Sequence, residues 1–315
     1  MSAVLMLSSA ILFCSLAFAE TKALAVQICL DRAGYSCNTI DGVWGGKSEQ
    51  AFRAFFAARN RDLKPTLPSG PDQIYDRYFS KAENLFRVET VTQADLDALV
   101  KIPSAPADKA KLPRMGYETI KEMFAERGHL SQRGLERLNP GVNWDHVQPG
   151  QKLVIPDFPS IEEELAVGSG MPRAAKRPSA ALVRVSLSRF EVSVYDEKGA
   201  CLAFFPCSIA KDKSKRPAEG ELKVVTKIPR PNYTYTPHSV PKGQKASKHI
   251  LMDGPNCPVG VAWIGLNIPS YGIHGTPQPE SIGSAESHGC FRLSNWNAAR
   301  LYALVNVGTK VIVDP

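Results

Sequence analysis

The chain has 315 residues, which is longer than one typical domain core, so we expect two or three domains. An apolar content of 43% and a charged content of 22% are ordinary for globular protein and argue against a disordered chain. The net charge of +7 comes from scattered basic residues without a dense tract or a recognisable nucleic-acid motif, so we expect no nucleic-acid partner.

The first 19 residues carry no charge and form an apolar run that ends Ala17-Phe18-Ala19. A short apolar core with a small-x-small ending predicts a signal peptide over residues 1–19, although the usual basic residue at its start is missing. The alternative is a permanent membrane anchor, but the run is slightly short for a span. We therefore expect an exported protein with no stable membrane insertion after cleavage.

Six cysteines follow the apolar run. Cys29 and Cys37 are close in the sequence, and in an oxidising compartment we expect them to form a disulfide. Cys201 and Cys207 are separated by about 20 Å along one expected strand, which is too far for them to bridge each other. The sequence leaves their other pairings, and that of Cys257, open.

Residues 20–102 contain two expected helices, over 24–33 and 47–59, and the second carries apolar residues at helical spacing. Between them lies Ile-Asp-Gly-Val-Trp-Gly (40–45), with a turn signal at Asp41-Gly42. This pattern resembles the small α-helical peptidoglycan-binding domain, which implies affinity for the bacterial wall. The alternative is that Trp44 and the helix phenylalanines only form a core.

A proline-containing linker over 103–113 precedes a second module over 114–157. Helices are expected over 116–127 and 132–138, the latter capped by Ser131, followed by a turn and a strand ending at Pro156. The module resembles the βααβ LysM domain, although its first strand is weakly marked. The resemblance implies binding to N-acetylglucosamine-containing glycan strands, and the alternative is a spacer that binds no sugar.

A second linker is expected over 158–180, and from residue 181 apolar residues recur with period two. The pattern predicts half-buried strands over 181–210, a helix over 297–305 and a final strand over 310–313. Residues 181–315 are therefore expected to form a mostly β domain with a short helix, so that the chain as a whole is multidomain.

The chemistry is concentrated in two stretches, Tyr271–Thr276 (YGIHGT) and Ser287–Leu293 (SHGCFRL). Within residues 274–292 they supply a thiol, two imidazoles and a guanidinium. A thiolate is a strong nucleophile, a neighbouring histidine can take its proton, and glycine backbone N–H groups can approach a substrate oxygen. A zinc site is the alternative, but His-x13-His-x-Cys supplies only three ligands in an unfamiliar spacing. We expect no metal and no cofactor.

These stretches closely resemble the L,D-transpeptidase catalytic domain, also called YkuD, which is a β-sandwich with a short helix. The resemblance spans about residues 182–314. It implies that Cys290 is the nucleophile and that His274 is the base, oriented by the carbonyl of Gly275. Backbone N–H groups of the nucleophile loop would form the oxyanion hole, and further side chains would contact substrate. The first group is His288, Gly289 and Cys290; the second is Arg292, Trp263 and Tyr271.

The resemblance further implies a reaction on peptidoglycan stem peptides, in the periplasm or at the cell wall. Cys290 would attack the third-residue carbonyl of a tetrapeptide stem, expel D-alanine and pass the acyl group to an amine, and carbapenems would acylate the same thiol. Hydrolysis of the acyl-enzyme, giving an L,D-carboxypeptidase, and a non-catalytic wall-binding protein are the alternatives. His288 and Arg292 could also have purely structural roles. We expect residues 20–157 to supply affinity rather than chemistry.

Overall fold

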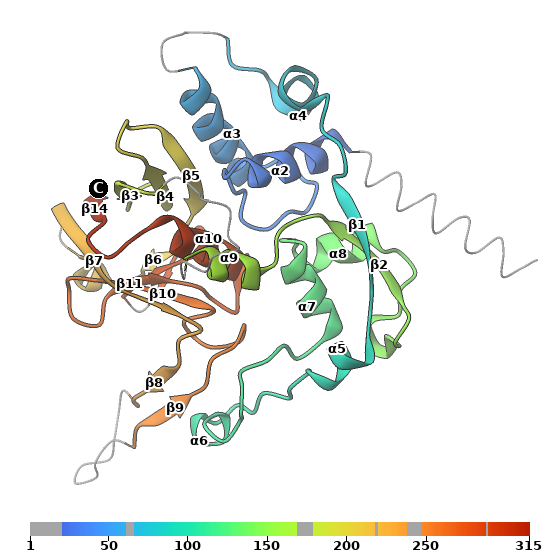
Figure 1. Cartoon of the computed structure of the whole chain (residues 1–315), viewed down its shortest axis with the longest axis vertical. Coiled ribbons are helices and arrows are strands. Elements are labelled where there is room, and N and C mark those ends of the chain that lie inside the picture. The colour runs from blue at the N-terminus through green and yellow to red at the C-terminus, as the bar shows by residue number, and fades with distance from the viewer. Residues whose placement is uncertain (1–20, 61–65, 169–178, 218–219, 238–246, 288) are drawn as a thin grey trace, which may run out of the picture.

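The computed structural model describes residues 21–60, 66–168, 179–217, 220–237, 247–287 and 289–315. The expected signal peptide over 1–19 and His288 lie outside the described residues. Figure 1 shows three parts that pack against one another: helices at the top, a smaller module on the right and a large sheet on the left. We call them the helical module (residues 21–79), the βααβ module (86–156) and the β domain (180–315).

The helical module is built around aromatic side chains. Phe52 and Phe55 are fully buried, and their rings contact one another and Tyr78. Thr21 caps the first helix by accepting a hydrogen bond from the Leu24 N–H, which agrees with the helix expected from residue 24. The elements are α2 (Lys22–Arg32), α3 (Gly46–Arg59), α4 (Gly70–Ile74) and the π-helical turn η1 (Tyr75–Phe79).

The βααβ module begins earlier than the sequence predicts. Its first strand, β1 (Phe86–Thr90), pairs antiparallel with β2 (Lys152–Pro156), so the sheet joins residues on both sides of the expected 103–113 linker. That segment carries a short helix and packs against the β domain. The remaining elements are α5 (Gln93–Asp97), α6 (Pro106–Lys109), α7 (Ile120–Arg127), α8 (Gln132–Leu138) and the 3-10 turn η2 (Trp144–His146).

The expected linker over 158–180 also contains a helix, α9 (Ile161–Gly168), which packs against α10 (Asn295–Leu304) of the β domain. The acidic side chain of Glu164 is buried there, and its carboxylate lies 3.7 Å from the guanidinium Nε of Arg300. This part of the connection is therefore packed onto the β domain.

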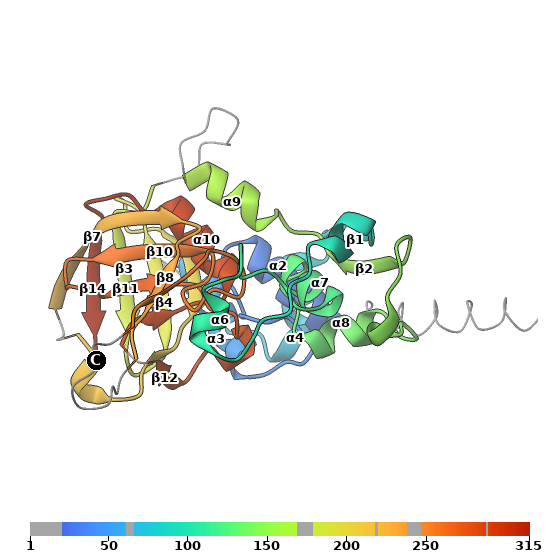
Figure 2. The same cartoon turned by 90° about the horizontal axis from the view of Figure 1, so that it is seen from below.

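The β domain contains an eight-stranded sheet in the order β13-β11-β10-β7-β14-β3-β4-β5, seen on the left of Figure 2. Two further two-stranded pairs, β6 with β12 and β8 with β9, lie beside it. The strands are β3 (Leu182–Ser186), β4 (Glu191–Tyr195), β5 (Cys201–Pro206), β6 (Ile209–Ala210), β7 (Gly220–Pro229), β8 (Tyr233–Tyr235), β9 (His249–Leu251), β10 (Ala262–Leu266), β11 (Gly272–His274), β12 (Ala285–Ser287), β13 (Phe291–Arg292) and β14 (Lys310–Asp314); η3 (Lys213–Lys215) and η4 (Pro279–Ser281) are 3-10 turns.

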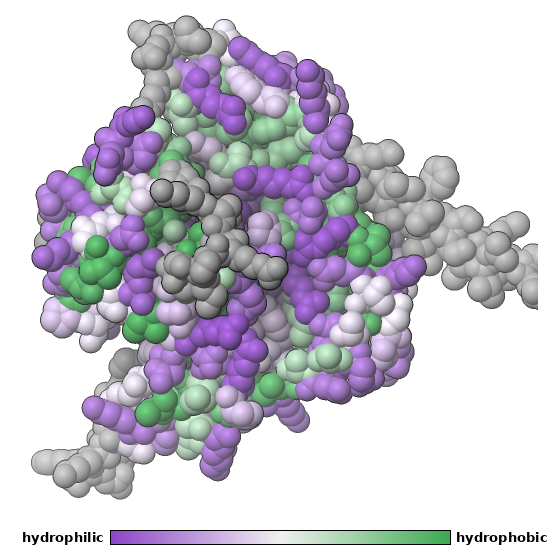
Figure 3. Space-filling model, viewed as in Figure 1, coloured by the Kyte–Doolittle hydropathy of each residue, from purple (hydrophilic) through white to green (hydrophobic). Residues whose placement is uncertain are grey.

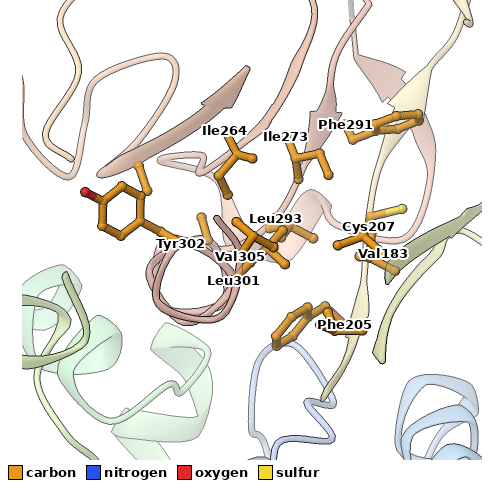
Figure 4. Close-up of a cluster of buried hydrophobic side chains, with 14 of the residues drawn as sticks. Val183, Phe205, Cys207, Ile264, Ile273, Phe291, Leu293, Leu301, Tyr302 and Val305 are labelled. Carbon is orange, nitrogen blue, oxygen red and sulfur yellow. The ribbon is translucent and has the colours of Figure 1, made fainter. Parts of the chain in front are cut away.

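Helix α10 covers one face of this sheet. Figure 4 shows Leu301 of α10 and Val305, which follows the helix, near Ile264 and Ile273 of the strands, and Tyr302 of the helix belongs to the same buried cluster. These side chains are almost fully buried, and so are Val183 and Val185, as the predicted period-two alternation requires for one face of a sheet. Burial of this face fixes the strand register, because a slip of one residue would expose the whole set.

The surface carries its apolar side chains in separate patches. In Figure 3 green areas are divided by purple ones on the face shown. The most exposed large apolar side chains among the described residues belong to Val43, Val88, Val225, Ile228, Ile250, Met252 and Val307. Within the described ranges, no helix is both long enough and apolar enough to cross a membrane.

Candidate active site

Strand register places three of the expected site residues in one row. Trp263 on β10 lies opposite His274 on β11, and His274 lies opposite Arg292 on β13. Directly paired residues share a face of the sheet, and their neighbours Ile273 and Phe291 point into the core. Period-two alternation therefore puts the imidazole, the indole and the guanidinium together on the face away from the core.

The imidazole of His274 is held on both sides. Its Nδ1–H donates to the carbonyl of Gly275 at 2.6 Å, and its ring stacks on Trp263 with centroids 5.4 Å apart. The hydrogen bond fixes the proton on Nδ1 and leaves the Nε2 lone pair to accept one. Burial lowers the pKa of His274 to about 4, and the positive charge of Arg292 contributes to this. At neutral pH the ring is uncharged and can act as a base.

Cys290 lies just before β13 and is partly exposed. Its thiol donates to the carbonyl of Ser270 at 3.6 Å, which places it beside the beginning of β11, the strand that carries His274. Burial raises the pKa of this thiol, while a backbone hydrogen bond from Gly272 and the charge of Arg292 oppose the rise. The resting group is therefore a thiol, and it needs a base before it can attack.

Of the residues expected to form the oxyanion hole, His288 lies outside the described residues, but Gly289 can be placed. A Cβ atom at Gly289 would meet no described atom within 4 Å other than those of its chain neighbours. The oxyanion hole itself stays a prediction.

The three expected substrate contacts differ in exposure. Trp263 and Arg292 are partly exposed on the site row. The ring of Tyr271 is packed in the core with Phe291 at 5.4 Å, and only 8% of the residue is exposed. Burial raises the pKa of Tyr271, and its hydroxyl has no hydrogen-bond partner among the described residues. The structure thus supports contact with substrate more strongly for the first two than for Tyr271.

The expected disulfide between Cys29 and Cys37 is wrong, because both thiols are free. Cys37 packs in the aromatic cluster around Phe52 and Phe55, which does not include Cys29. Closeness in sequence did not bring the two sulfur atoms together. Burial raises the pKa of Cys29 to about 11 and that of the buried Cys257 to about 11, so neither is a ready nucleophile. In the described part of the chain, no group of three His, Cys, Asp or Glu side chains could hold a metal.

Sequence reasoning missed the contribution of the N-terminal modules to the loop between His274 and Cys290. Asn38 donates its amide to the carbonyl of Pro279 at 2.7 Å, and Lys47 donates to the carbonyl of Ile282. Each of these hydrogen bonds joins residues that are more than 230 positions apart in the sequence, so no local sequence pattern predicts it. The expectation that residues 20–157 supply affinity alone does not account for them.

Comparison with known proteins identifies the β domain. Residues 180–313 match the family model of the L,D-transpeptidase catalytic domain, YkuD. They form a YkuD-type catalytic domain. The match begins at residue 180, so it does not describe the helical or βααβ modules.

Two curated relatives illustrate the extent of the similarity. The YkuD protein of Bacillus licheniformis is 27% identical over 198 residues, which are 63% of this chain and 94% of that protein. The YqjB protein of Bacillus subtilis is 34% identical over 100 residues, which are 30% of this chain and 50% of that protein. An L,D-transpeptidase structure from Mycobacterium smegmatis has 23% identity and a TM-score of 0.34, covering 43% of this chain and 59% of that one.

Proposed function

We propose that this protein is a peptidoglycan L,D-transpeptidase with Cys290 as its nucleophile. The observation that supports the proposal is a neutral, oriented imidazole on β11 and a partly exposed thiol just before the adjacent parallel strand β13, within a YkuD-type catalytic domain. The buried apolar face of the sheet holds both strands in register, which keeps the two groups in place.

The proposed reaction has two steps. His274 Nε2 takes the proton of the Cys290 thiol, and the thiolate attacks the carbonyl of the third residue of a tetrapeptide stem. The tetrahedral intermediate collapses to a thioester, and the departing D-alanine amine receives the proton from His274. An amine of another stem then attacks the thioester and releases the thiol. Water in place of that amine would make the enzyme an L,D-carboxypeptidase.

Several parts of the chain have proposed roles beyond the reaction itself. Arg292 can hold a substrate carboxylate by two parallel hydrogen bonds, while Trp263 offers an apolar wall beside the imidazole. We further propose that residues 1–19 direct export, that the protein acts in the periplasm or at the wall, and that the two N-terminal modules bind stem peptides or glycan strands. No cofactor enters this scheme.

Acylation by a carbapenem tests the site directly, because the strained ring carbonyl resembles the donor amide. Intact-mass spectrometry over time should show one adduct on the wild-type protein and none on Cys290→Ser. His274→Ala should slow acylation by about 10²–10⁴-fold, the usual contribution of a positioned base. Cys257→Ser and Cys37→Ser are matched controls and should label at the wild-type rate.

Incubation with purified muropeptides separates the possible reactions. Cross-linked dimers with release of D-alanine support transfer, whereas shortened monomers alone support the carboxypeptidase. A wild-type protein that binds sacculi but makes no adduct and no product would indicate a non-catalytic wall-binding protein. An adduct mapped to Cys257 would overturn the assignment of Cys290.

A further inference from the structure

A buried hydrogen-bond chain links the βααβ module to the catalytic domain. Glu126 on α7 accepts a hydrogen bond from the Tyr117 hydroxyl at 2.7 Å on one carboxylate oxygen. On the other it accepts a bond from the side-chain amide of Asn295, the first residue of α10, at 2.9 Å. Glu126 is only 7% exposed and Asn295 is fully buried. The contact therefore lies inside the interface between the two parts.

The surroundings of Asn295 require one orientation of its amide. Its Nδ2 donates both to Glu126 and to the carbonyl of Pro255 at 3.0 Å, while its Oδ1 accepts from the Val261 N–H at 3.3 Å. A reversed amide would place its oxygen against two acceptors and its NH₂ against a donor. The Pro255 carbonyl and the Val261 N–H favour the same orientation, and the carboxylate oxygen of Glu126 adds a third, side-chain partner that holds the amide in place.

The amide oxygen of Asn295 lies close against the backbone of Gly260 and Gly275, next to His274. A Cβ atom on Gly275 would lie 2.4 Å from Asn295 Oδ1, and one on Gly260 would lie 2.1 Å from it. These glycines let the backbone close tightly onto the amide. The carbonyl of Gly275 is the group that accepts the Nδ1–H of His274. A displaced Asn295 would therefore move the acceptor that aligns the imidazole.

We propose that Glu126 is a positioning residue of the active site, acting through Asn295 on the Gly275 carbonyl and thus on His274. This makes the βααβ module a structural part of the catalytic machinery. The proposal rests on the proposed function for its kinetic consequence, but the geometry of His274 can be measured without any reaction.

The kinetic test uses two carboxylates of the same helix. Glu126→Met removes the acceptor beside Asn295, and we expect carbapenem acylation of Cys290 to slow by about tenfold or more, since small misplacements of a base are costly. Glu126→Gln should react at nearly the wild-type rate, because its oxygen still accepts from Asn295 and its NH₂ can donate to Tyr117. Glu122→Met is the matched control: Glu122 accepts from Asn256 across the same interface but does not contact Asn295.

The structural test follows the imidazole by nitrogen NMR of histidine-labelled protein, with the His274 signals assigned from His274→Ala. Wild type, Glu126→Gln and Glu122→Met should show one tautomer, protonated on Nδ1. Glu126→Met should show a shifted or mixed tautomer. If Glu126→Met does not fold, Glu126→Asp, whose shorter side chain withdraws the acceptor, replaces it in both experiments.

The outcomes separate the two proposals. A wild-type protein that forms no adduct contradicts the proposed function, while the NMR signals still report on Glu126. A folded Glu126→Met that acylates as fast as Glu122→Met and keeps the wild-type His274 tautomer overturns the positioning role.

Discussion

Two buried carboxylates join the N-terminal modules to the catalytic domain, and they differ in their partners. Asp31 on α2 contacts His129 Nδ1 at 3.1 Å and Arg300 Nη1 at 3.2 Å. Burial alone would raise its pKa, but His129 and Arg300 outweigh this effect and hold the pKa of Asp31 at about 2. Glu126 has neutral donors instead, and burial raises its pKa to about 7.

The comparison shows that equal burial does not decide the charge of a carboxyl group. At Asp31 a cation of the catalytic domain favours the ionised form, so all three parts of the molecule meet at a fixed charge. At Glu126 the ionised form is favoured only by hydrogen bonds from Tyr117 and Asn295, and nearby Glu122 opposes it. We therefore expect the Asp31 contacts to stabilise the folded protein. Glu126 instead keeps Asn295 in place, and its ionised form lowers the free energy of unfolding.

The largest expected effect comes from removing the first carboxylate. Asp31→Ala removes the carboxylate beside the buried guanidinium of Arg300, which keeps its hydrogen bond to the backbone carbonyl of residue 31 and the more distant Glu164. This loss of a buried charge partner should lower the free energy of unfolding by about 3–5 kcal/mol. Urea unfolding at pH 7 measures this. Asp76→Ala breaks an exposed pair with Lys22, which water screens, and should change the free energy of unfolding far less than Asp31→Ala. Similar losses in the two variants would mean that the buried junction contributes no special stability.

The second prediction concerns the pH dependence of stability. Glu126 and Asp31 should change the free energy of unfolding in opposite directions as pH rises. The folded-state pKa of Glu126 is raised from 4.5 to about 7, so its contribution to stability is lost as pH rises through that interval. Glu126→Gln should therefore gain up to roughly 3 kcal/mol relative to wild type between pH 4 and pH 8. The depressed pKa of Asp31 acts oppositely, since its contribution is lost as pH falls from about 4 towards 2.

Unfolding midpoints measured from pH 3 to pH 9 follow both effects. A constant difference between Glu126→Gln and wild type across this range would contradict the assignment of a raised pKa. Asp31→Ala should lose less of its own stability in acid than wild type, because the group that titrates there is absent.

A smaller effect is expected from His129, whose ring stacks between Phe158 at 4.1 Å and Trp296 at 5.1 Å. His129→Phe keeps an aromatic ring in this stack but removes the hydrogen bond to Asp31. The loss should be about 1.5–3 kcal/mol, the usual contribution of one hydrogen bond to a charged group. Thermal unfolding of His129→Phe and wild type measures this loss. A loss as large as that of Asp31→Ala would show that the hydrogen bond from His129 stabilises the protein more than the ion pair with Arg300.

The sequence points to His274 and Cys290 as reactive groups, which stay a prediction, but to none of the long-range contacts around them. His274 and Cys290 could be identified because they lie in two short stretches, whereas β11, which carries His274, and β13, which follows Cys290, were not predicted. The bond between Glu126 and Asn295 could not be predicted, since the two residues are 169 positions apart and each looks like an ordinary polar residue of a helix.

Other predictions failed for the same physical reason. The disulfide between Cys29 and Cys37 was inferred from spacing, which says nothing about side-chain direction on a helix. Strand β1 was overlooked as part of the βααβ module because its partner, β2, begins more than 60 residues later. Helices and strands depend on local pattern, whereas the pairing of modules depends on contacts that only the folded chain defines.

The position of β14 in the large sheet has a consequence for biosynthesis. This strand lies between β7 and β3 and is hydrogen-bonded to both, so it joins two halves of the sheet. Translation produces β14 after every other strand of that sheet. Until then β3, β4 and β5 cannot join the strands that carry His274 and Arg292, and the sheet relies on contacts between distant parts of the chain, which form slowly. The two halves of the sheet are therefore joined only after β14 has been synthesised, and the partly made chain is exposed to misfolding during that interval.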